Sequence, residues 1–379
     1  MKTKYLSLFL LTAVFLGCNT SKNQVLIDIS NPSSLDRENE MVEISWKDVQ
    51  AKLAVSGDQK IIIADSSEQQ IPYQLVTNGA DSVELLVFPV SLKAGKKATF
   101  QISEGIPVDF QPMVYGRLVP ERKDDFTWEN NRVAFRVYGP ALQETGEISN
   151  GMDFWTKKTD SLIIDKWYKN DLSGAASYHQ DHGEGLDFYK VGRTLGLGMT
   201  APFNNDTLIL GKNFVGSQIL DEGPLRMTVK LSYEPYDVLG KTVTETRIIS
   251  LDAYSQLNKI TNIFEVDTTD FEVATGIVMV ADKPEVTYGV NTGILAYEVP
   301  ADSLNGTIYT GVIHPKGFGA VKVADGHYLG LNSYQVGTPY TYYAGGGWSK
   351  AGFGSFDEWT KFLNDQRGKL AAPLKVEIK

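Results

Sequence analysis

The chain has 379 residues, a length that fits one or two domains with a sizeable buried core. Its 36 Lys and Arg against 46 Asp and Glu give a formal net charge of -10 with no long basic run, which excludes binding to a nucleic-acid backbone. With 42% hydrophobic and 22% charged residues, the chain is neither disordered nor a polytopic membrane protein. A single cysteine excludes an intramolecular disulfide and a multi-cysteine zinc site.

The amino terminus has the pattern of an exported lipoprotein. Lys2 and Lys4 precede an apolar run, residues 5–16, that is too short for a spanning helix and is typical of a signal peptide. Cys18 follows where a lipoprotein signal peptidase would cut, so residues 1–18 are predicted to be a signal peptide with its lipobox. We expect a lipid anchor on this cysteine in the bacterial cell envelope. The periplasmic side is favoured because the polar tether that follows lacks an acidic run; the alternative is a buried thiol in an ordinary first strand.

Alternation with period two predicts a small β-sandwich over residues 19–105. Apolar and polar residues alternate in four segments of this region, which is typical of strands with one buried face. The connections carry Asn-Pro, Ser-Gly-Asp, Asn-Gly-Ala and Ala-Gly-Lys, residues that short antiparallel turns need. The predicted strands are 25–29, 60–64, 83–88 and 98–102.

A second, longer β-rich domain is predicted over residues 106–379. Its clearest strands are expected at 133–138, 207–210, 226–233, 243–251, 257–266, 274–280 and 328–331. One short helix near the C-terminus is predicted by the capping box Ser355-Phe-Asp-Glu358, followed by Trp359, Phe362 and Leu363 on one face. The chain is therefore predicted to be all-β, with an N-terminal β-sandwich and a large antiparallel β-supersandwich of the mutarotase-like kind.

The strongest chemical signal is the polar segment 178–190. It holds two of the four histidines, His179 and His182, with Tyr178 and Tyr189 near its ends. Its carboxylates are Asp181, Glu184 and Asp187. Such a segment can bring an acid, a base and orienting groups together. The alternatives are a calcium-binding or hydrogen-bonded turn that only folds a long connection, or a divalent-metal site; because the histidine spacing matches no recognised metal motif, we expect no cofactor.

Cations flank this segment on both sides. Lys166 and Lys169 precede it, and Lys190 and Arg193 follow it. In an acidic protein they would form a locally positive patch, which favours an anionic substrate. Three nearby glycines form no dinucleotide fingerprint, since no helix pattern follows, and we interpret them as sites of close strand packing or bulges: Gly192, Gly196 and Gly198.

Two further segments are candidates for substrate binding. In the first, Arg117 and Arg122 could hold a uronate carboxylate and Trp128 could stack on a sugar. The alternative is a buried ion-pair lattice formed by Glu121, Arg122, Asp124 and Asp125. In the second, residues 340–350, Trp348 and Lys350 lie in an aromatic, Gly-rich stretch that suits carbohydrate stacking, although such aromatics more often pack in a core. The two remaining histidines, His314 and His327, are interpreted as structural.

Three runs together resemble one protein family. They are Tyr-His-x-Asp-His-Gly-Glu-Gly-Leu-Asp-x-Tyr-Lys-Val-Gly (178–192), Val-Pro-Glu-Arg-Lys-Asp-Asp-x-x-Trp-Glu-Asn (119–130) and the Gly-Trp-Ser-Lys that ends at Lys350. The family comprises Bacteroidetes lipoproteins encoded in polysaccharide-utilisation loci and was long described only as a domain of unknown function. Within it, the chain is most similar to the ulvan oligosaccharide dehydratases of marine flavobacteria. The resemblance implies elimination of water from the non-reducing terminal uronic acid, which leaves a 4,5-unsaturated end for an unsaturated-glucuronyl hydrolase.

The chemistry of such an elimination defines the parts that a site must contain. Abstraction of H5 beside a carboxylate builds negative charge, so a cation must neutralise that carboxylate. Hydroxide is a poor leaving group, so a general acid must protonate the departing oxygen while a base takes the proton. The hypothesis assigns His179 or His182 as base or acid, Tyr178 or Tyr189 in the complementary role, and Arg193, Lys166 and Arg122 on the carboxylate. Further substrate contacts are assigned to Arg117, Trp128, Glu184, Trp348 and Lys350.

Three rival functions are consistent with the same residues. A glycoside hydrolase would use two of the three carboxylates in segment 178–190. A polysaccharide lyase would share the elimination step but expel a sugar and shorten the chain. A non-catalytic glycan-binding lipoprotein would stack Trp128, Trp167 and Trp348 on sugar rings. In every case the expected partner is an anionic oligosaccharide.

Overall fold

The N-terminal part is a sandwich of two antiparallel sheets. The computed structural model describes residues 24–53, 60–267, 270–280 and 293–379. The first sheet has the order β25-β1-β6-β3 and the second β2-β5-β4, and both bury their apolar faces in one common core. The elements are β1 (Gln24–Ser30), β2 (Arg37–Ser45), α1 (Trp46–Gln50), β3 (Ile61–Ala64), β4 (Gln74–Val76), β5 (Leu85–Leu92), β6 (Lys97–Glu104) and β25 (Lys375–Ile378).

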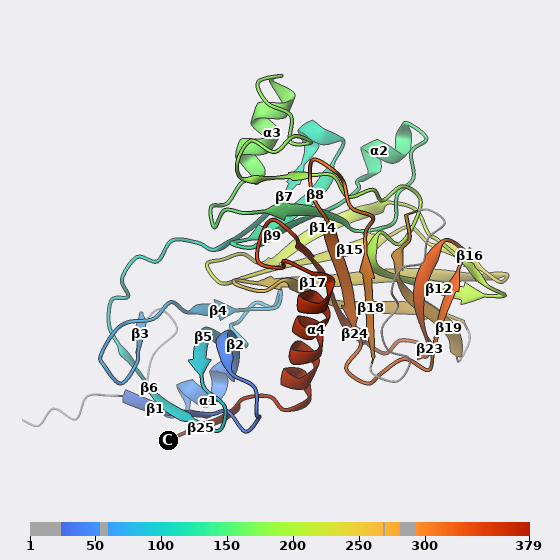
Figure 1. The fold of residues 1–379 in the computed structure, drawn as a ribbon. Helices are drawn as coiled ribbons and strands as arrows, with labels where there is room; N and C mark the ends of the chain where they lie inside the picture. Colours follow the sequence, from blue (N-terminus) through green and yellow to red (C-terminus); the bar gives the residue numbers. More distant parts are fainter. Residues whose placement is uncertain (1–23, 54–59, 268–269, 281–292) are drawn as a thin grey trace, which may run out of the picture.

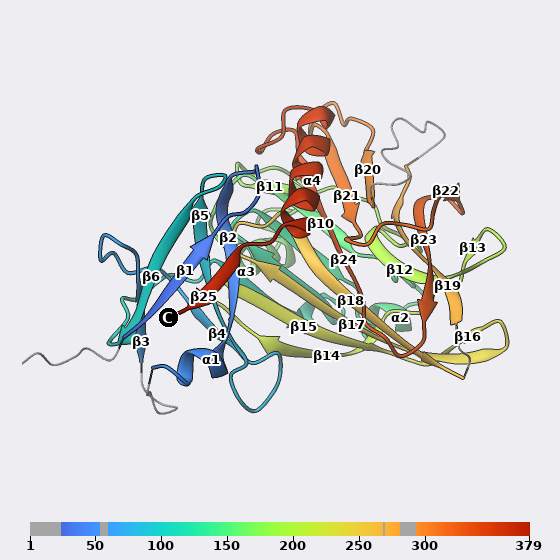
Figure 2. The same cartoon turned by 90° about the horizontal axis from the view of Figure 1, so that it is seen from below.

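The last strand of the chain belongs to the N-terminal sandwich, although the division expected at residue 105 assigned it to the second domain. β25 pairs antiparallel with β1, and Ile378 lies opposite Ile27 (Figure 2). The carboxyl-terminal residues therefore complete the N-terminal sandwich although they are the most distant from it in sequence. The two parts are joined further by Arg226, whose guanidinium bonds Glu43 at 2.6 Å and Asp252 at 2.6 Å.

The larger part consists of three antiparallel sheets around one extensive core (Figure 1). An eight-stranded sheet contains β14 (Phe214–Asp221), β15 (Arg226–Tyr233), β16 (Tyr236–Val238), β17 (Lys241–Asp252), β18 (Leu257–Val266), β24 (Tyr340–Trp348), β21 (Ile308–Ile313) and β20 (Ile294–Glu298). A five-stranded sheet contains β13 (Thr207–Leu208), β12 (Leu197–Asn204), β19 (Asp270–Val278), β23 (His327–Gln335) and β22 (Ala320–Ala324). The predicted all-β class is thus confirmed.

A second five-stranded sheet has the order β11-β10-β9-β8-β7 and positions the candidate site. Its strands are β7 (Val114–Val119), β8 (Asp125–Asn130), β9 (Val133–Val137), β10 (Asp153–Lys157) and β11 (Gly185–Asp187). Alternate residues such as Phe126, Phe135 and Phe154 point into the main core. The opposite face carries polar and charged residues, yet it is also buried, because α3 (Ile164–Leu172) and the segment after it lie across it (Figure 1). We call it the polar face of the small sheet.

The predicted C-terminal helix is confirmed as α4 (Phe356–Ala371). The Ser355 hydroxyl accepts from the Glu358 backbone N–H at 3.3 Å, and the Glu358 carboxylate accepts from the backbone N–H of Gly354 at 2.7 Å. Trp359 and Leu363 are buried on the face that packs against β20 and β21. Helices α1, α2 (Pro140–Glu144) and α3 and the 3-10 turn Pro120–Arg122 were not predicted. No helix among the described residues is long and apolar enough to cross a membrane. Residues 1–23, with Cys18, lie outside the described residues.

The glycine interpretation holds at two of three positions. Gly196 and Gly198 have φ of 57° and 81°, and a Cβ at Gly198 would lie 2.3 Å from that of Ala344. The register of β12 against β19 also shifts there, as a bulge requires. A Cβ on Gly192, in contrast, would meet nothing within 4 Å, so this glycine serves its left-handed backbone (φ 59°) and not close packing.

Candidate active site

Four charged side chains meet on the polar face of the small sheet, one from each of the strands β8, β9, β10 and β11. Arg136 on β9 lies between Asp153 on β10, at 2.7 Å, and Asp187 on β11, at 2.8 Å. Asp125 on β8 completes the group, with its Oδ2 3.9 Å from Arg136 Nε. None of the four side chains is more than 4% exposed. We call them the Arg136 cluster.

The cluster holds three carboxylates against one fully buried guanidinium. Burial raises the pKa of Asp125 to about 6, although Arg136 and Arg122 both oppose this. Burial and the neighbouring Asp153 also raise the pKa of Asp187 well above its usual value. Asp125 Oδ2 reaches Arg122 at 3.4 Å, which is ion-pair and not hydrogen-bond distance. The three carboxylates are therefore stabilised by the two arginines and by neutral donors, among them the Phe154 backbone N–H and the Trp155 indole on Asp153.

His179 is the exposed group attached to this cluster. Its side chain is 59% exposed, and its Nδ1 lies 2.9 Å from the backbone oxygen and 3.6 Å from the carboxylate of Asp187. A carbonyl oxygen can only accept, so Nδ1 must carry the proton. The neutral ring then has its lone pair on Nε2, the atom that can act as a base.

Two further accessible groups contact the same cluster. Arg122 is 28% exposed and pairs with Asp125. Tyr138, half-buried, places its ring 5.2 Å from the Arg136 guanidinium. Burial and the charge of Asp153 raise the pKa of Tyr138 well above its ordinary value, so its phenol stays protonated at neutral pH and can donate.

Tyr178, predicted as an acid or base, lies deeper. Its ring stacks on Trp155 at 5.1 Å, and its hydroxyl accepts from Arg136 Nη1 at 3.4 Å. Only a small part of it reaches the surface. It serves mainly to hold the guanidinium and the adjacent His179, whose ring centroid lies 4.5 Å from that of Tyr178.

His182 and Lys166 line a separate small cavity of about 70 Å³ between α3 and the 176–185 segment. His182 Nε2 lies 3.1 Å from the Ser177 carbonyl oxygen. Lys166 bonds Glu184 at 2.8 Å, and the Trp167 indole donates to the same carboxylate at 3.3 Å. This cavity is too small for a sugar ring, and His179 does not line it.

Part of the 178–190 segment is a hydrogen-bonded turn, as the alternative interpretation expected. The Asp181 carboxylate accepts from the backbone N–H groups of Gly183, at 2.8 Å, and Gly185, at 3.2 Å, and bonds Lys158 at 2.6 Å. Burial tends to raise the pKa of Asp181, but these donors together hold it below its usual value. The Lys166 ammonium likewise lowers the pKa of Glu184.

Several predicted substrate contacts are corrected by burial. Trp128 is 0% exposed and its indole donates to Asn258 at 2.8 Å, because the register of β8 directs it into the core. Trp348 is 2% exposed and donates to the Asn305 carbonyl, so its face cannot stack on a sugar. Tyr189 is also buried, which removes it from direct contact with a substrate.

The predicted cations differ in how far they are already engaged. Arg117 bonds both Glu121 and Asp165, each at 2.6 Å, so two carboxylates already neutralise its positive charge. The lattice predicted around Arg122 exists in part, through Asp125. Arg193 is exposed and has no ion pair within the part of the chain that the structure describes. Lys350 is exposed, and its Nζ donates to the Leu304 carbonyl at 2.6 Å.

The other two histidines are buried, and burial lowers the pKa of both. His327 Nε2 accepts from the Leu195 backbone N–H at 3.0 Å, so its role is structural. His314 stacks on Tyr340 at 5.0 Å. Over residues 24–53, 60–267, 270–280 and 293–379, no group of three His, Cys, Asp or Glu is arranged to hold a metal ion. Among the three clustered carboxylates the cation is Arg136 itself.

Three residues of this site were not predicted: Arg136, Asp153 and Tyr138. The stretch Asp125-Phe-Thr-Trp-Glu129 on the neighbouring strand alternates charged or polar with aromatic residues, but it contains none of the three. Alternation of this kind normally indicates a strand with one solvated face. Only the burial of that face beneath α3 turns its charged residues into a cluster.

Known proteins include sequence and structural relatives of this chain. The chain is 32% identical over 378 residues to "Uncharacterized protein P7" of Formosa agariphila, and the alignment covers 93% of each chain. Among solved structures, it is similar to an α-mannosidase from Enterococcus faecalis (TM-score 0.49) and to a glycosyl hydrolase family 38 protein from the same organism (TM-score 0.53), each at 8% identity. These matches cover 94% of this chain and 46% and 47% of theirs, so the chain spans about half the length of each. The second match supports the β-rich fold alone. A family model matches residues 29–376, and the chain therefore belongs to the family described as "Domain of unknown function (DUF4861)".

Proposed function

We propose that the protein is a carbohydrate dehydratase that eliminates water from the non-reducing terminal uronic acid of ulvan oligosaccharides and leaves a 4,5-unsaturated end. The observation that carries the proposal is the placing of His179, Arg122 and Tyr138 on one buried charge cluster. They are a base, a cation and a protonated phenol, which are the three parts that elimination next to a carboxylate needs.

Each group has a defined role in the proposed step. Arg122 pairs with the uronate carboxylate and stabilises the negative charge that develops when C5 loses its proton. His179 Nε2 takes that proton, and the electrons of the C5–H bond form the C4–C5 double bond. Tyr138 gives its proton to O4 as the C4–O bond breaks, so that water leaves. Transfer of the proton from the imidazolium back to the phenolate restores both residues.

The Arg136 cluster orients His179 and stabilises the positive charge that forms on its ring. The backbone oxygen of Asp187 accepts a hydrogen bond from the Nδ1–H of His179, and the Asp187 carboxylate stabilises the imidazolium that forms. Arg136 in turn holds that carboxylate at 2.8 Å. Arg136 is thus a positioning residue, since it acts through Asp187.

The carboxylates of the 178–190 segment favour elimination over hydrolysis. A glycosidase needs one carboxylic acid whose pKa is raised so that it can protonate the leaving group. The pKa values of Asp181 and Glu184 are instead lowered by their bonds to lysines and backbone donors. Asp187 has a raised pKa but is buried against Arg136.

The test uses purified protein without residues 1–18 and saturated ulvan oligosaccharides, followed by ultraviolet absorbance and mass spectrometry. Products lighter by one water, with new absorbance and no shortening, are expected. Shortened chains with absorbance would indicate a lyase, and shortened chains without it a hydrolase. No change with bound oligosaccharide would favour the glycan-binding alternative.

A pair of histidine variants tests the roles within the site. His179→Ala should lower kcat by about 10²- to 10⁴-fold, the usual loss on removing a general base. His182→Ala is the matched control, because His182 lines the separate small cavity that His179 does not line, and it should retain most activity. Equal losses in both variants, with folding verified, would contradict this assignment.

We also propose that Cys18 anchors the protein in the bacterial cell envelope, on the periplasmic side. The support is the sequence pattern of residues 1–18. Cys18→Ala should move the protein from the membrane fraction to the soluble fraction of the cell. Protease treatment of intact cells would leave a periplasmic form uncleaved.

A further inference from the structure

A larger cavity of about 680 Å³ opens near Lys157 at the end of β10, whereas Asp153 of the Arg136 cluster begins that strand. Five basic residues contribute to its lining, against two carboxylates, in a protein whose formal net charge is -10. The basic residues are Arg132, Lys157, Lys158, Lys350 and Lys369. We call it the basic cavity. The lining is positive although the protein as a whole is negative, and a locally positive cavity of this kind attracts an anion.

The lysines are engaged to different extents. Lys157 is fully buried and neutralised by Glu129 at 2.5 Å, so it contributes little to the cavity. Lys158 is partly exposed and shared with Asp181. Lys350 is exposed, and the partner of its ammonium is the neutral Leu304 carbonyl at 2.6 Å, so its positive charge is not balanced there.

A buried ring positions two of these charges. The ammonium groups of Lys158 and Lys350 each lie 5.7 Å from the ring centroid of Trp348. The ring is locked by the hydrogen bond from its indole N–H to Asn305. Trp348 therefore does not stack on a sugar but holds two cations beside the cavity through cation–π attraction.

The basic cavity adjoins the segment that carries His179. The ring of Phe188 lies 6.4 Å from that of Trp348, and Lys158 bonds Asp181 of the same segment. Resting on the proposed function, we propose that the basic cavity is a second subsite, which binds an anionic substituent on a sugar unit behind the reacting end. The substituent is a sulfate ester or a carboxylate, since both present oxygens to ammonium groups.

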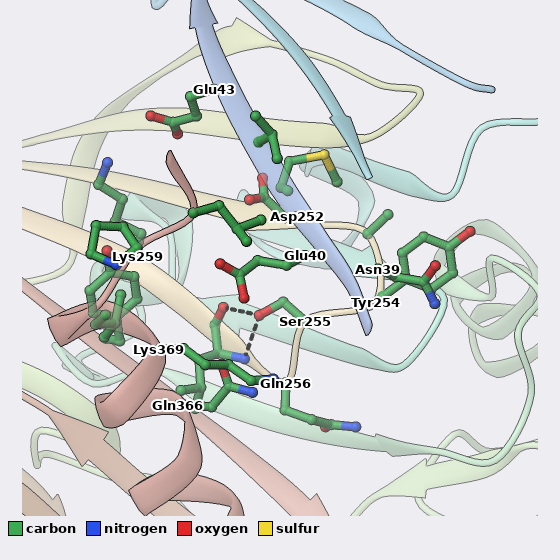
Figure 3. Close-up of a pocket in the computed structure, with 18 of the residues that line it drawn as sticks. Asn39, Glu40, Glu43, Asp252, Tyr254, Ser255, Gln256, Lys259, Gln366 and Lys369 are labelled. Atoms are coloured by element: carbon green, nitrogen blue, oxygen red, sulfur yellow. Dashed lines mark hydrogen bonds between the residues drawn. The ribbon is translucent and has the colours of Figure 1, made fainter. Parts of the chain in front are cut away.

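A neighbouring cavity of about 510 Å³ shows why the anion belongs in the basic one (Figure 3). The two cavities share lining residues, among them Asn39, Tyr254 and Gln366. The second is lined by more carboxylates than cations, and Figure 3 shows those of Glu40, Glu43 and Asp252 around it. An anionic group would be repelled there. The difference in lining charge between the two adjoining cavities favours the Trp348 end for the subsite.

The test measures binding by calorimetry with the purified protein and an ulvan tetrasaccharide that already has a 4,5-unsaturated end. This ligand cannot lose water again, so its affinity is independent of turnover. Lys350→Met should weaken binding about three- to fivefold, as expected for one exposed ion pair, and Lys158→Met by a similar factor. Lys259→Met is the matched control, because Lys259 is an exposed lysine that lines the neighbouring cavity of Figure 3, and it should leave the affinity unchanged.

Chemically altered ligands separate the two sources of the anion. Loss of the Lys350 effect with a desulfated tetrasaccharide would assign the subsite to a sulfate ester. Loss of the effect with a carboxyl-reduced tetrasaccharide would assign it to a carboxylate. Unchanged affinity in Lys350→Met and Lys158→Met would overturn the proposal, even if the protein dehydrates its substrate. A lysine-dependent affinity without dehydration would support the subsite and refute the dehydratase alone.

Discussion

Asp125→Asn tests whether the Arg136 cluster is held together at a cost in stability. The Asp125 carboxylate is fully buried, and its pKa is raised from 3.8 to about 6 by that burial. The native state therefore binds this proton more tightly than the unfolded state does. By linkage, the stability of the native protein falls as pH rises from the unfolded pKa through the native one.

The size of the effect follows from these two pKa values. With a native pKa of about 6 and an unfolded pKa of 3.8, ionisation of Asp125 lowers the free energy of unfolding by about 3 kcal/mol at pH 7 and about 0.5 kcal/mol at pH 4. An amide of the same shape cannot ionise. Its N–H donors beside two arginines lower stability as well, but by an amount that does not depend on pH. The stability of the variant relative to the wild type should therefore rise by about 2.5 kcal/mol between pH 4 and pH 7.

Urea unfolding followed by tryptophan fluorescence at pH 4, 5.5 and 7 measures this difference. Asp181→Asn is the opposite control, because the native pKa of Asp181 is lowered. Its carboxylate contributes stability above the unfolded pKa that is lost as pH falls through the native one, so this variant should lose most at pH 7. If the free energies of unfolding of Asp125→Asn and the wild type changed in parallel with pH, the reasoning would be refuted, because the native pKa of Asp125 would then not be raised.

Three other variants test the site and the fold. Arg122→Met should lower kcat/KM about a hundredfold because it removes the cation opposite the developing charge, whereas Arg117→Met, whose guanidinium is already bound by two carboxylates, should keep near wild-type activity on saturated oligosaccharides. Lys157→Met breaks a fully buried ion pair and should lower the free energy of unfolding by about 3–5 kcal/mol. Lys361→Met breaks an exposed helical ion pair and should lower it by at most about 0.5 kcal/mol, so similar urea midpoints for the two variants would contradict this prediction. Ser355→Ala removes the N-cap of α4 and should destabilise the protein by about 1 kcal/mol in the same assay, while an unchanged midpoint would show that packing alone holds the helix end.

Local patterns predicted the regular elements well where one face of a strand is solvated. The strands expected at 226–233 and 257–266 have these same bounds in β15 and β18. The capping box at Ser355 likewise predicted the start of α4. In each case the determining interactions are between residues close in sequence, so the sequence pattern is sufficient.

The segment 340–350 shows where such patterns fail. Its glycines and aromatics suited carbohydrate stacking, with core packing as the alternative, and residues Tyr340–Trp348 form β24 in the core of the eight-stranded sheet. A Cβ on Gly345 would lie 1.9 Å from the Gln256 backbone oxygen, so glycine is required by a neighbour 89 positions away. A requirement set by a distant strand leaves no periodic signal in the local sequence.

The candidate site likewise combines features that the local sequence predicts with features that only tertiary packing decides. The sequence by itself determined the all-β class, the helix cap and the concentration of acid–base residues in segment 178–190, because composition, periodicity and turn chemistry are local properties. Only the tertiary structure separated His179 from His182, buried Trp128 and Trp348, and brought Arg136 beside Asp153 and Asp187. The burial of Trp348 follows from its place at the end of β24, and the other outcomes follow from which face of the small sheet lies beneath α3. Burial of that face changes the solvation of every charge on it, and solvation is decided by the packing of elements that are distant in sequence.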